Sequence, residues 1–124
     1  MLQQGILLSP ENAALRYAMG LMLVRANQAE AGLDALRRAY ELDPSSSRYA
    51  YVLGVALNSL GQHTDALALL EEARADFPAD FDIGWALATM LRDAGKLDRA
   101  RIVAAELARQ FPDDANVDAL RKSL

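Results

Sequence analysis

The sequence predicts an all-α fold, an α-solenoid built of antiparallel helix pairs. Its four prolines recur at a constant interval, at Pro10, Pro44, Pro78 and Pro112. A constant period of roughly 34 residues is typical of repeat proteins, in which each unit buries its apolar face against the next. Alanine and leucine are abundant whereas β-branched residues are few, which favours helices over strands. We therefore expect about three units of this length with partial helices on either side.

The prolines also predict the boundaries of the repeats within the 124 residues. Residues 12–44, 45–78 and 79–112 are expected to form repeats 1, 2 and 3 of a single array. Residues 1–10 are expected to be the end of a preceding repeat. Residues 113–124 are expected to form a partial capping helix, in which Val117, Leu120 and Leu124 share one face. Positions that are separated by the interval between the prolines are called a repeat column below.

Each unit is predicted to contain a helix A, a short turn, a helix B and a turn that holds the proline. Apolar residues at spacings of 4, 7, 8 and 11 mark one face of helix A in each repeat. In repeat 1 these residues are Leu15, Met19, Met22, Leu23 and Ala26. In repeat 2, helix A is expected at about residues 48–60 and helix B at about residues 64–76, with Thr64 as the N-cap of helix B.

Three repeat columns hold small or turn-forming residues. The helix-A column, where two helices must approach closely, contains Gly20, Gly54 and Ala88. The column near the start of helix B contains Gly32, Ala66 and Ala100. Between the two helices, a residue with positive φ is expected in the column of Asn27, Gly61 and Gly95.

These columns resemble those of the tetratricopeptide repeat family. That family has a unit of about 34 residues, with a Leu-Gly pair in helix A, a glycine at the turn, two alanines in helix B and a terminal Asp-Pro. The corresponding residues here include Leu53-Gly54, Gly61, Ala66, Ala73 and Asp43-Pro44. The resemblance covers nearly the whole chain, and it implies a scaffold that binds a protein or peptide on the concave face built by helix A.

One departure from the family pattern concerns the aromatic residues of helix A. They stand one position later than the usual packing aromatic, at Tyr17, Tyr51 and Trp85. We expect these rings to line the binding groove, while packing between repeats remains the alternative. The resemblance implies that outward positions of helix A bind the ligand, and the ten predicted binding residues among them are Tyr17, Leu21, Val24, Arg25, Tyr51, Val55, Asn58, Trp85, Thr89 and Arg92. Because this set contains no lysine, the carboxylate-clamp type of site is not expected.

Composition and motifs argue against several other functions. The net charge of −4 does not favour a nucleic-acid partner, which needs a basic stripe. No apolar run reaches the roughly 20 residues of a membrane-spanning helix, so membrane insertion is not expected. The chain has no cysteine and one histidine, His63, which is expected at the surface. Glu71 and Glu72 are expected on a solvated face of helix B. We therefore expect no enzyme, no metal site and no cofactor.

Three functional hypotheses remain open at this point. The first is a scaffold that binds a protein or peptide. The second is a structural module that self-associates through its groove or through its end helices. The third is an accessory interaction segment of a larger bacterial protein, because some helices resemble C-terminal repeats of bacterial proteins that carry multihaem redox segments. The sequence leaves the compartment, cytoplasm or periplasm, undecided.

Overall fold

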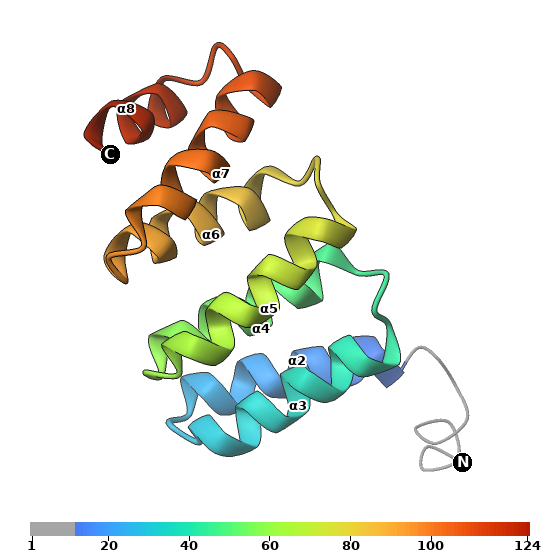
Figure 1. The fold of residues 1–124 in the computed structure, drawn as a ribbon. Helices are drawn as coiled ribbons and strands as arrows, with labels where there is room; N and C mark the ends of the chain where they lie inside the picture. The colour runs from blue at the N-terminus through green and yellow to red at the C-terminus, as the bar shows by residue number, and fades with distance from the viewer. Residues whose placement is uncertain (1–11) are drawn as a thin grey trace, which may run out of the picture. The chain divides into compact units, whose positions relative to one another are not determined.

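The computed structural model describes residues 12–124, which form seven helices and no strand. The helices are α2 (Asn12–Arg25), α3 (Ala29–Leu42), α4 (Ser47–Ser59), α5 (His63–Asp76), α6 (Phe81–Asp93), α7 (Leu97–Gln110) and α8 (Ala115–Ser123), as Figure 1 shows. The prediction of an all-α fold is confirmed. The predicted end of a preceding repeat, residues 1–10, lies outside the described residues.

The chain divides into two compact units, Met1–Ala66 and Leu67–Leu124. In the first unit α3 packs against both α2 and α4, and in the second α7 packs against both α6 and α8. The pairs α2–α3 and α6–α7 are antiparallel, as expected for helices joined by short turns (Figure 1). The arrangement of all repeats in a single array, with boundaries at residues 44, 78 and 112, stays a prediction.

The turns from helix A to helix B are built in the same way three times. Asn27, Gly61 and Gly95 have positive φ angles of 64°, 85° and 76°. In the next position, the backbone N–H groups of Gln28, Gln62 and Lys96 each donate back to a helix-A carbonyl at 2.9 Å. This bond satisfies a carbonyl that the end of a helix leaves open, and only a left-handed residue allows it. The predicted turn column is confirmed.

The turns from helix B to the next helix A explain the proline column. The carbonyl of Asp43 accepts a hydrogen bond from the N–H of Ser46 at 3.2 Å, and the equivalent bonds after α5 and α7 measure 3.1 and 3.2 Å. Proline is the second residue of each turn, where its fixed φ is favourable. The side chains of Ser46, Asp80 and Asp114 then cap α4, α6 and α8 by accepting from the backbone N–H three residues later.

Two predicted details of repeat 2 differ from the structure by one residue. Helix A runs from Ser47 to Ser59, one residue earlier at each end than predicted. The prediction that Thr64 caps helix B is wrong, because α5 begins at His63 and Thr64 therefore lies inside its first turn. The short turn sets this start, so a hydroxyl one position later cannot serve as the cap.

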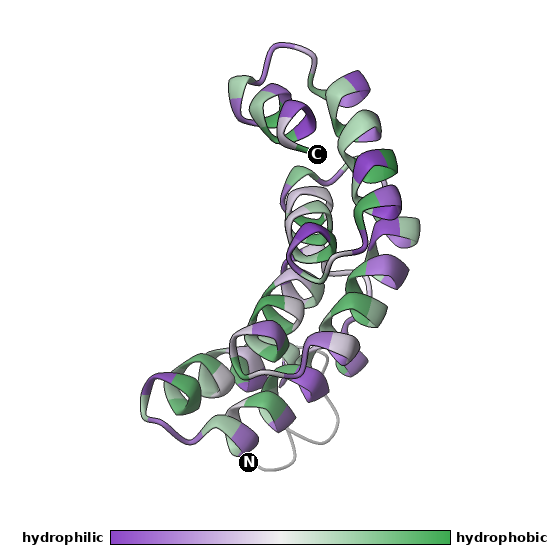
Figure 2. Cartoon of the chain, turned by 60° about the vertical axis from the view of Figure 1, so that its left-hand side comes forward, coloured by the Kyte–Doolittle hydropathy of each residue, from purple (hydrophilic) through white to green (hydrophobic). Residues whose placement is uncertain are grey.

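The small columns lie where two helices touch. A Cβ atom added to Gly20 would stand 2.7 Å from Cγ of Leu36, and one added to Gly32 would stand 2.6 Å from Cγ2 of Val24. Both distances are shorter than carbon atoms tolerate, so these glycines permit the close approach of α2 and α3. Every helix carries hydrophobic as well as hydrophilic residues, as Figure 2 shows, and burial of the hydrophobic side holds these short helices together.

A buried arginine joins α5 and α7 inside the second unit. Arg74 is only 6% exposed. It donates to the carbonyl of Pro78 at 2.7 Å and to Oε1 of Gln110 at 3.3 Å, and it lies 3.7 Å from Glu106. Gly84 makes room for it, because a Cβ there would stand 2.9 Å from Nη1 of Arg74. The guanidinium is therefore paired on several sides, as a buried charge must be.

Candidate functional site

Five of the ten predicted binding residues line one cavity in the first unit. The cavity lies between α2 and α4, has a volume of about 270 Å³, and is called the α2–α4 cavity below. Its lining residues are Leu21, Val24, Arg25, Leu36, Tyr51, Val52, Val55, Ala56, Ser59 and Leu60. Leu21, Val24, Arg25, Tyr51 and Val55 are the five that were predicted. The structure thus brings together outward residues of two successive A helices.

Local structure explains why these side chains converge. Leu21, Val24 and Arg25 occupy the last turns of α2, just before the left-handed residue Asn27 ends the helix. In the neighbouring helix, Tyr51, Val55 and Ser59 repeat at intervals of four and so share one face of α4. Leu36 of α3 is buried and contributes to the same lining.

The chemistry of the α2–α4 cavity is mainly apolar. Arg25 is its one charged lining residue, and the hydroxyl groups of Tyr51 and Ser59 are its other side-chain polar groups. A volume of about 270 Å³ is below the usual range for a small-molecule pocket and matches one or two apolar side chains. The arrangement can therefore bind an apolar side chain and provide one positive charge beside it.

Two other predicted residues of the first unit have partners of their own. Tyr17 packs against Tyr49 with tilted rings whose centroids are 4.9 Å apart, and its hydroxyl accepts a hydrogen bond from Nε of Arg48 at 3.4 Å. Oδ1 of Asn58 lies 2.7 Å from Nδ1 of His63. Neither Tyr17 nor Asn58 lines the α2–α4 cavity.

The three predicted residues of the second unit are also engaged locally. Trp85 stacks on Phe81 with ring centroids 5.9 Å apart and nearly parallel planes, and Phe81 meets the edge of Phe111 at 5.0 Å. The hydroxyl of Thr89 donates back to its own helix, to the carbonyl of Trp85 at 2.9 Å. Arg92 forms an ion pair with Asp93 at 3.0 Å. These residues therefore take part in contacts within unit 2.

The lining residues that were not among the ten predicted binding residues are Leu36, Val52, Ala56, Ser59 and Leu60. Ala56 and Leu60 are in the repeat columns of Met22 and Ala26, which belong to the apolar stripe of helix A. Part of this lining could have been predicted, since a cavity between neighbouring A helices is lined by the edge of the apolar stripe as well as by the outward face. Leu36 belongs to helix B, and only the packing of α2 on α3 brings it to this site.

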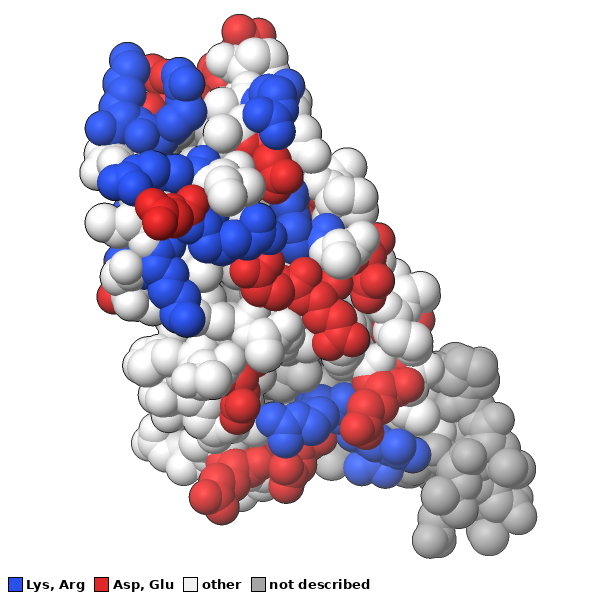
Figure 3. Space-filling model, in the orientation of Figure 1, with Lys and Arg blue, Asp and Glu red and all other residues white. Residues whose placement is uncertain are grey.

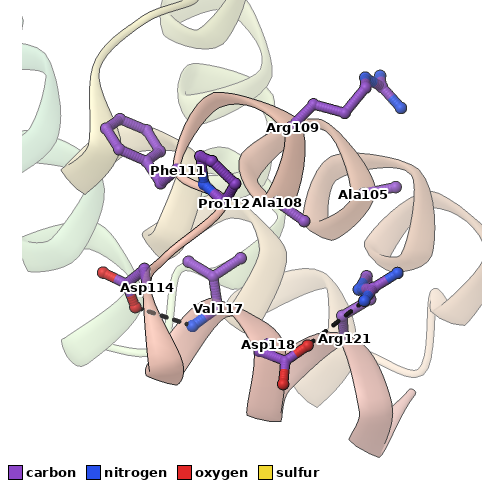
Figure 4. Close-up of a pocket in the computed structure, with 9 residues that line it drawn as sticks. All are labelled: Ala105, Ala108, Arg109, Phe111, Pro112, Asp114, Val117, Asp118 and Arg121. Atoms are coloured by element: carbon purple, nitrogen blue, oxygen red, sulfur yellow. Dashed lines mark hydrogen bonds and ion pairs between the residues drawn. The ribbon is translucent and has the colours of Figure 1, made fainter.

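A larger cavity of about 380 Å³ lies between α7 and α8, but its charged groups are mostly paired. Figure 4 shows Asp118 facing Arg121, whereas Arg109 is directed away from this pair. Hydrogen bonds from Lys122 and Arg121 lower the pKa of the Asp118 carboxyl. Asp114, which also lines this cavity, caps α8. These carboxylates therefore have structural partners.

The ion pair between Glu71 and Arg99 in unit 2 corrects the prediction that Glu71 lies on a solvated face of helix B. This residue is half-buried and accepts two hydrogen bonds from Arg99, at 2.7 and 3.0 Å, so it is not simply solvated. The hydrogen bond lowers the pKa of Glu71 and raises that of Arg99. Figure 3 shows the basic and acidic side chains lying beside one another on one face of the molecule.

Within residues 12–124 we find no helix with the length and apolar composition that a membrane span requires. The same range contains no group of three or more histidine and acidic side chains placed to hold a metal ion.

Two family models described as tetratricopeptide repeat match the chain, one over residues 17–80 and the other over residues 57–124. Each match covers more than half of the 124 residues. No match was found among curated proteins.

Solved structures with a similar fold include three helical repeat proteins. The type III secretion chaperone SycD of Yersinia enterocolitica, in complex with a peptide of the translocator YopD, is 14% identical, with a TM-score of 0.77 over 91% of this chain and 92% of that chain. MamA residues 41 to the end from Desulfovibrio magneticus is 20% identical, with a TM-score of 0.76 over 88% of this chain and 62% of that one. The OM64 TPR domain of Arabidopsis is 12% identical, with a TM-score of 0.75 over 91% and 93%. The fold is an α-solenoid of antiparallel helix pairs, and the chain belongs to the tetratricopeptide repeat family.

Proposed function

We propose that the chain is a peptide-binding scaffold whose α2–α4 cavity receives an apolar side chain of a partner protein. Family and fold support a protein-interaction scaffold in general terms. The observation that carries the finer proposal is the convergence of Leu21, Val24, Arg25, Tyr51 and Val55 on one apolar cavity. Apolar clefts with few polar groups are the usual anchor sites of protein interfaces.

A structural relative supports the same kind of ligand. SycD, which shares the fold, is known in complex with a peptide of the translocator YopD. The volume of about 270 Å³ suits an anchor such as leucine or phenylalanine better than a whole cofactor. Tyr51 is the aromatic residue of this lining, and truncation of a central aromatic typically costs about 2 kcal/mol of binding free energy or more.

The proposal can be tested by selecting displayed random peptides on the wild-type chain. Val55→Glu places a charge in the cavity, while Ile102→Glu, at an exposed apolar position of α7, is the matched control. We expect the selected peptides to share an apolar residue, to bind the Ile102→Glu variant, and to lose binding to the Val55→Glu variant. Both variants must show wild-type helix content by circular dichroism. Equal binding to the two variants would show that the ligand uses another surface.

A second candidate function is self-association through the outer face of α2. Leu15, Met19 and Met22 on this helix are 38%, 40% and 66% exposed. A patch of exposed apolar side chains commonly marks an interaction surface. Sedimentation velocity at several concentrations tests this candidate, since a monomer at all concentrations contradicts it. The hypothesis of an accessory segment in a larger bacterial redox protein stays a prediction.

A further inference from the structure

The charge of the α2–α4 cavity lies at one end of its lining. Arg25 and Ser59, which share a repeat column, are the last residues of α2 and α4, and both line the cavity. Leu21 and Val55, four positions earlier in the two helices, also share a column and line the cavity. Residues four apart lie on the same face of a helix. The single charge of the lining therefore stands one helical turn beyond an apolar pair.

The guanidinium of Arg25 is available to a ligand. Arg25 is exposed, and among residues 12–124 no hydrogen bond or ion pair joins it to another side chain. Other exposed arginines, such as Arg38, Arg92 and Arg101, each pair with a carboxylate of their own helix. Helices α2 and α4 contain no aspartate or glutamate that could do the same. An unpaired guanidinium beside an apolar cavity suits a carboxylate of the ligand.

The opposite end of the described lining offers no second cation. Arg48 is the charged residue of α4, but it does not line the cavity. Its Nε already donates to the hydroxyl of Tyr17 at 3.4 Å, and its guanidinium carbon lies 6.0 Å from the ring centroid of Tyr51. The charge that this cavity can pair is therefore single, and it lies on one side of the anchor residue.

The distance from the apolar pair to Arg25 indicates where that charge stands in the ligand. Leu21 precedes Arg25 by four residues, over which an α-helix rises about 6 Å. An extended peptide covers this distance in about two residues. When an anchor side chain lies between Leu21 and Val55, the carboxylate therefore belongs to the first or second residue beside the anchor.

We propose that the ligand of the α2–α4 cavity is a peptide segment with an apolar anchor residue and, one or two positions away on one side only, an aspartate or glutamate that pairs with Arg25. This inference rests on the proposed function and specifies its ligand class. A terminal carboxylate is the less suitable source, because capture of a chain end uses backbone N–H groups, whereas the C-terminal end of a helix presents carbonyl groups. Arg25 then selects among apolar peptides by charge complementarity.

The test uses the peptides selected on the wild-type chain, made with acetylated and amidated ends. Every acidic residue is first replaced by glutamine, and a single glutamate is then placed one or two positions before or after the anchor. We expect glutamate on one side of the anchor to tighten binding about two- to fivefold at low salt, as suits an exposed ion pair, and the gain to shrink as ionic strength rises. Glutamate on the other side should leave the affinity unchanged.

Variants of Arg25 show whether this residue provides the gain. Arg25→Gln should remove the gain and leave the affinity of the glutamine version unchanged. Arg25→Glu should reverse the preference, so that lysine at the same peptide position binds more tightly than glutamate. Arg92→Gln is the matched control and should alter no affinity, since Arg92 stands in the last turn of α6 and pairs with Asp93. Circular dichroism checks that the three variants keep the helix content of the wild-type chain.

Several results would overturn the inference while the proposed function stands. They are equal affinity of the glutamate and glutamine versions for the wild-type chain, equal gains from glutamate on both sides of the anchor, and a gain that persists in Arg25→Gln. A peptide that ends at the anchor with a free carboxyl group, and binds more tightly than any version with an internal glutamate, would also overturn it. If no selected peptide loses binding to the Val55→Glu variant, the proposed function and this inference fall together.

Discussion

The first and the third A helices use the same repeat column in opposite ways. Met19 of α2 is 40% exposed, whereas Leu87 of α6, two repeats later in the same column, is fully buried. Leu53 of α4, between them in the sequence, is also buried. The residue type is apolar in all three, so the difference lies in what covers the helix. The apolar stripe of helix A identifies a face that needs a neighbour, and α2 has no such neighbour among residues 12–124.

Helix α8, which follows the third repeat, has charged residues in two of the same repeat columns. In α8 the column of Leu87 holds Arg121, and the column of Gly84 holds Asp118. These two residues form an ion pair at 3.3 Å, and Lys122 adds a second at 3.0 Å. Val117 and Leu120 remain buried on the other side of α8. A helix with one buried face and one charged face needs no further partner, whereas α2 exposes apolar side chains.

The largest loss of stability is expected when the buried residue of this column, Leu87, is replaced by a charged one. Leu87→Arg places in α6 the residue that α8 has in the same column. Because Leu87 is fully buried, an unpaired charge there should lower the free energy of unfolding by about 3–5 kcal/mol. Met19→Arg should change it by only about 0.5 kcal/mol, since this side chain is already partly in water. Denaturant unfolding of both variants checks the prediction, and equal midpoints would contradict the comparison.

A smaller loss of stability is expected for a substitution in the column that contains Gly84 and Asp118. Gly84→Ala adds a Cβ that would stand 2.7 Å from Cδ2 of Leu107 and 2.9 Å from Nη1 of Arg74. Overpacking of this kind should cost about 1–3 kcal/mol of stability. Asp118→Ala in the same column of α8 is the control and should leave the midpoint nearly unchanged. Thermal unfolding measured for the two variants distinguishes a close helix contact from a solvated position. A stable Gly84→Ala protein would mean that Leu107 and Arg74 can move aside.

The ion pair between Glu71 and Arg99 predicts a pH dependence. Since hydrogen bonding to Arg99 lowers the folded-state pKa of Glu71 below its ordinary value of 4.5, the stabilisation is fully present above about pH 4.5. It is lost as the pH falls through the lower folded-state pKa. Both side chains are more than one-third exposed, so the effect should stay below about 1 kcal/mol. Comparing the wild-type chain with Glu71→Gln between pH 3 and pH 6 measures it. An identical pH profile for the two proteins would show that the pair contributes nothing.

The smallest change in stability is expected on the exposed face of α2. Met22→Ser should alter the free energy of unfolding by no more than about 0.5 kcal/mol, because Met22 is 66% exposed. If this face mediates self-association, the same variant should weaken it in sedimentation velocity. Lys122→Ser on the charged face of α8 should change neither quantity. A large loss of stability in Met22→Ser would mean that this side chain is covered in the folded protein.

Much of the fold could be predicted because it depends on local rules that recur in every repeat. The turn and small columns follow from backbone requirements that only a few residue types meet, so the sequence alone predicts them. They include the left-handed residues Asn27, Gly61 and Gly95 and the proline turns. The predicted cap at Thr64 failed by one residue, because the length of the preceding turn sets where α5 begins. Side-chain partners were harder to predict, since the half-buried pairing of Glu71 with Arg99 joins residues of two different helices.

For the candidate site, the sequence by itself could predict which residues share one side of helix A, because the helical periodicity places them there. Only the tertiary structure decided which of these residues share a cavity. Tyr51 lines the α2–α4 cavity, while Tyr17 packs against Tyr49 and Trp85 stacks on Phe81. The three aromatics occupy one repeat column, yet their surroundings differ because the neighbouring side chains are not repeated. Leu21, Val24 and Leu36 pack beside α4 at distances that depend on the volumes of all these residues together, and no repeat period contains that information.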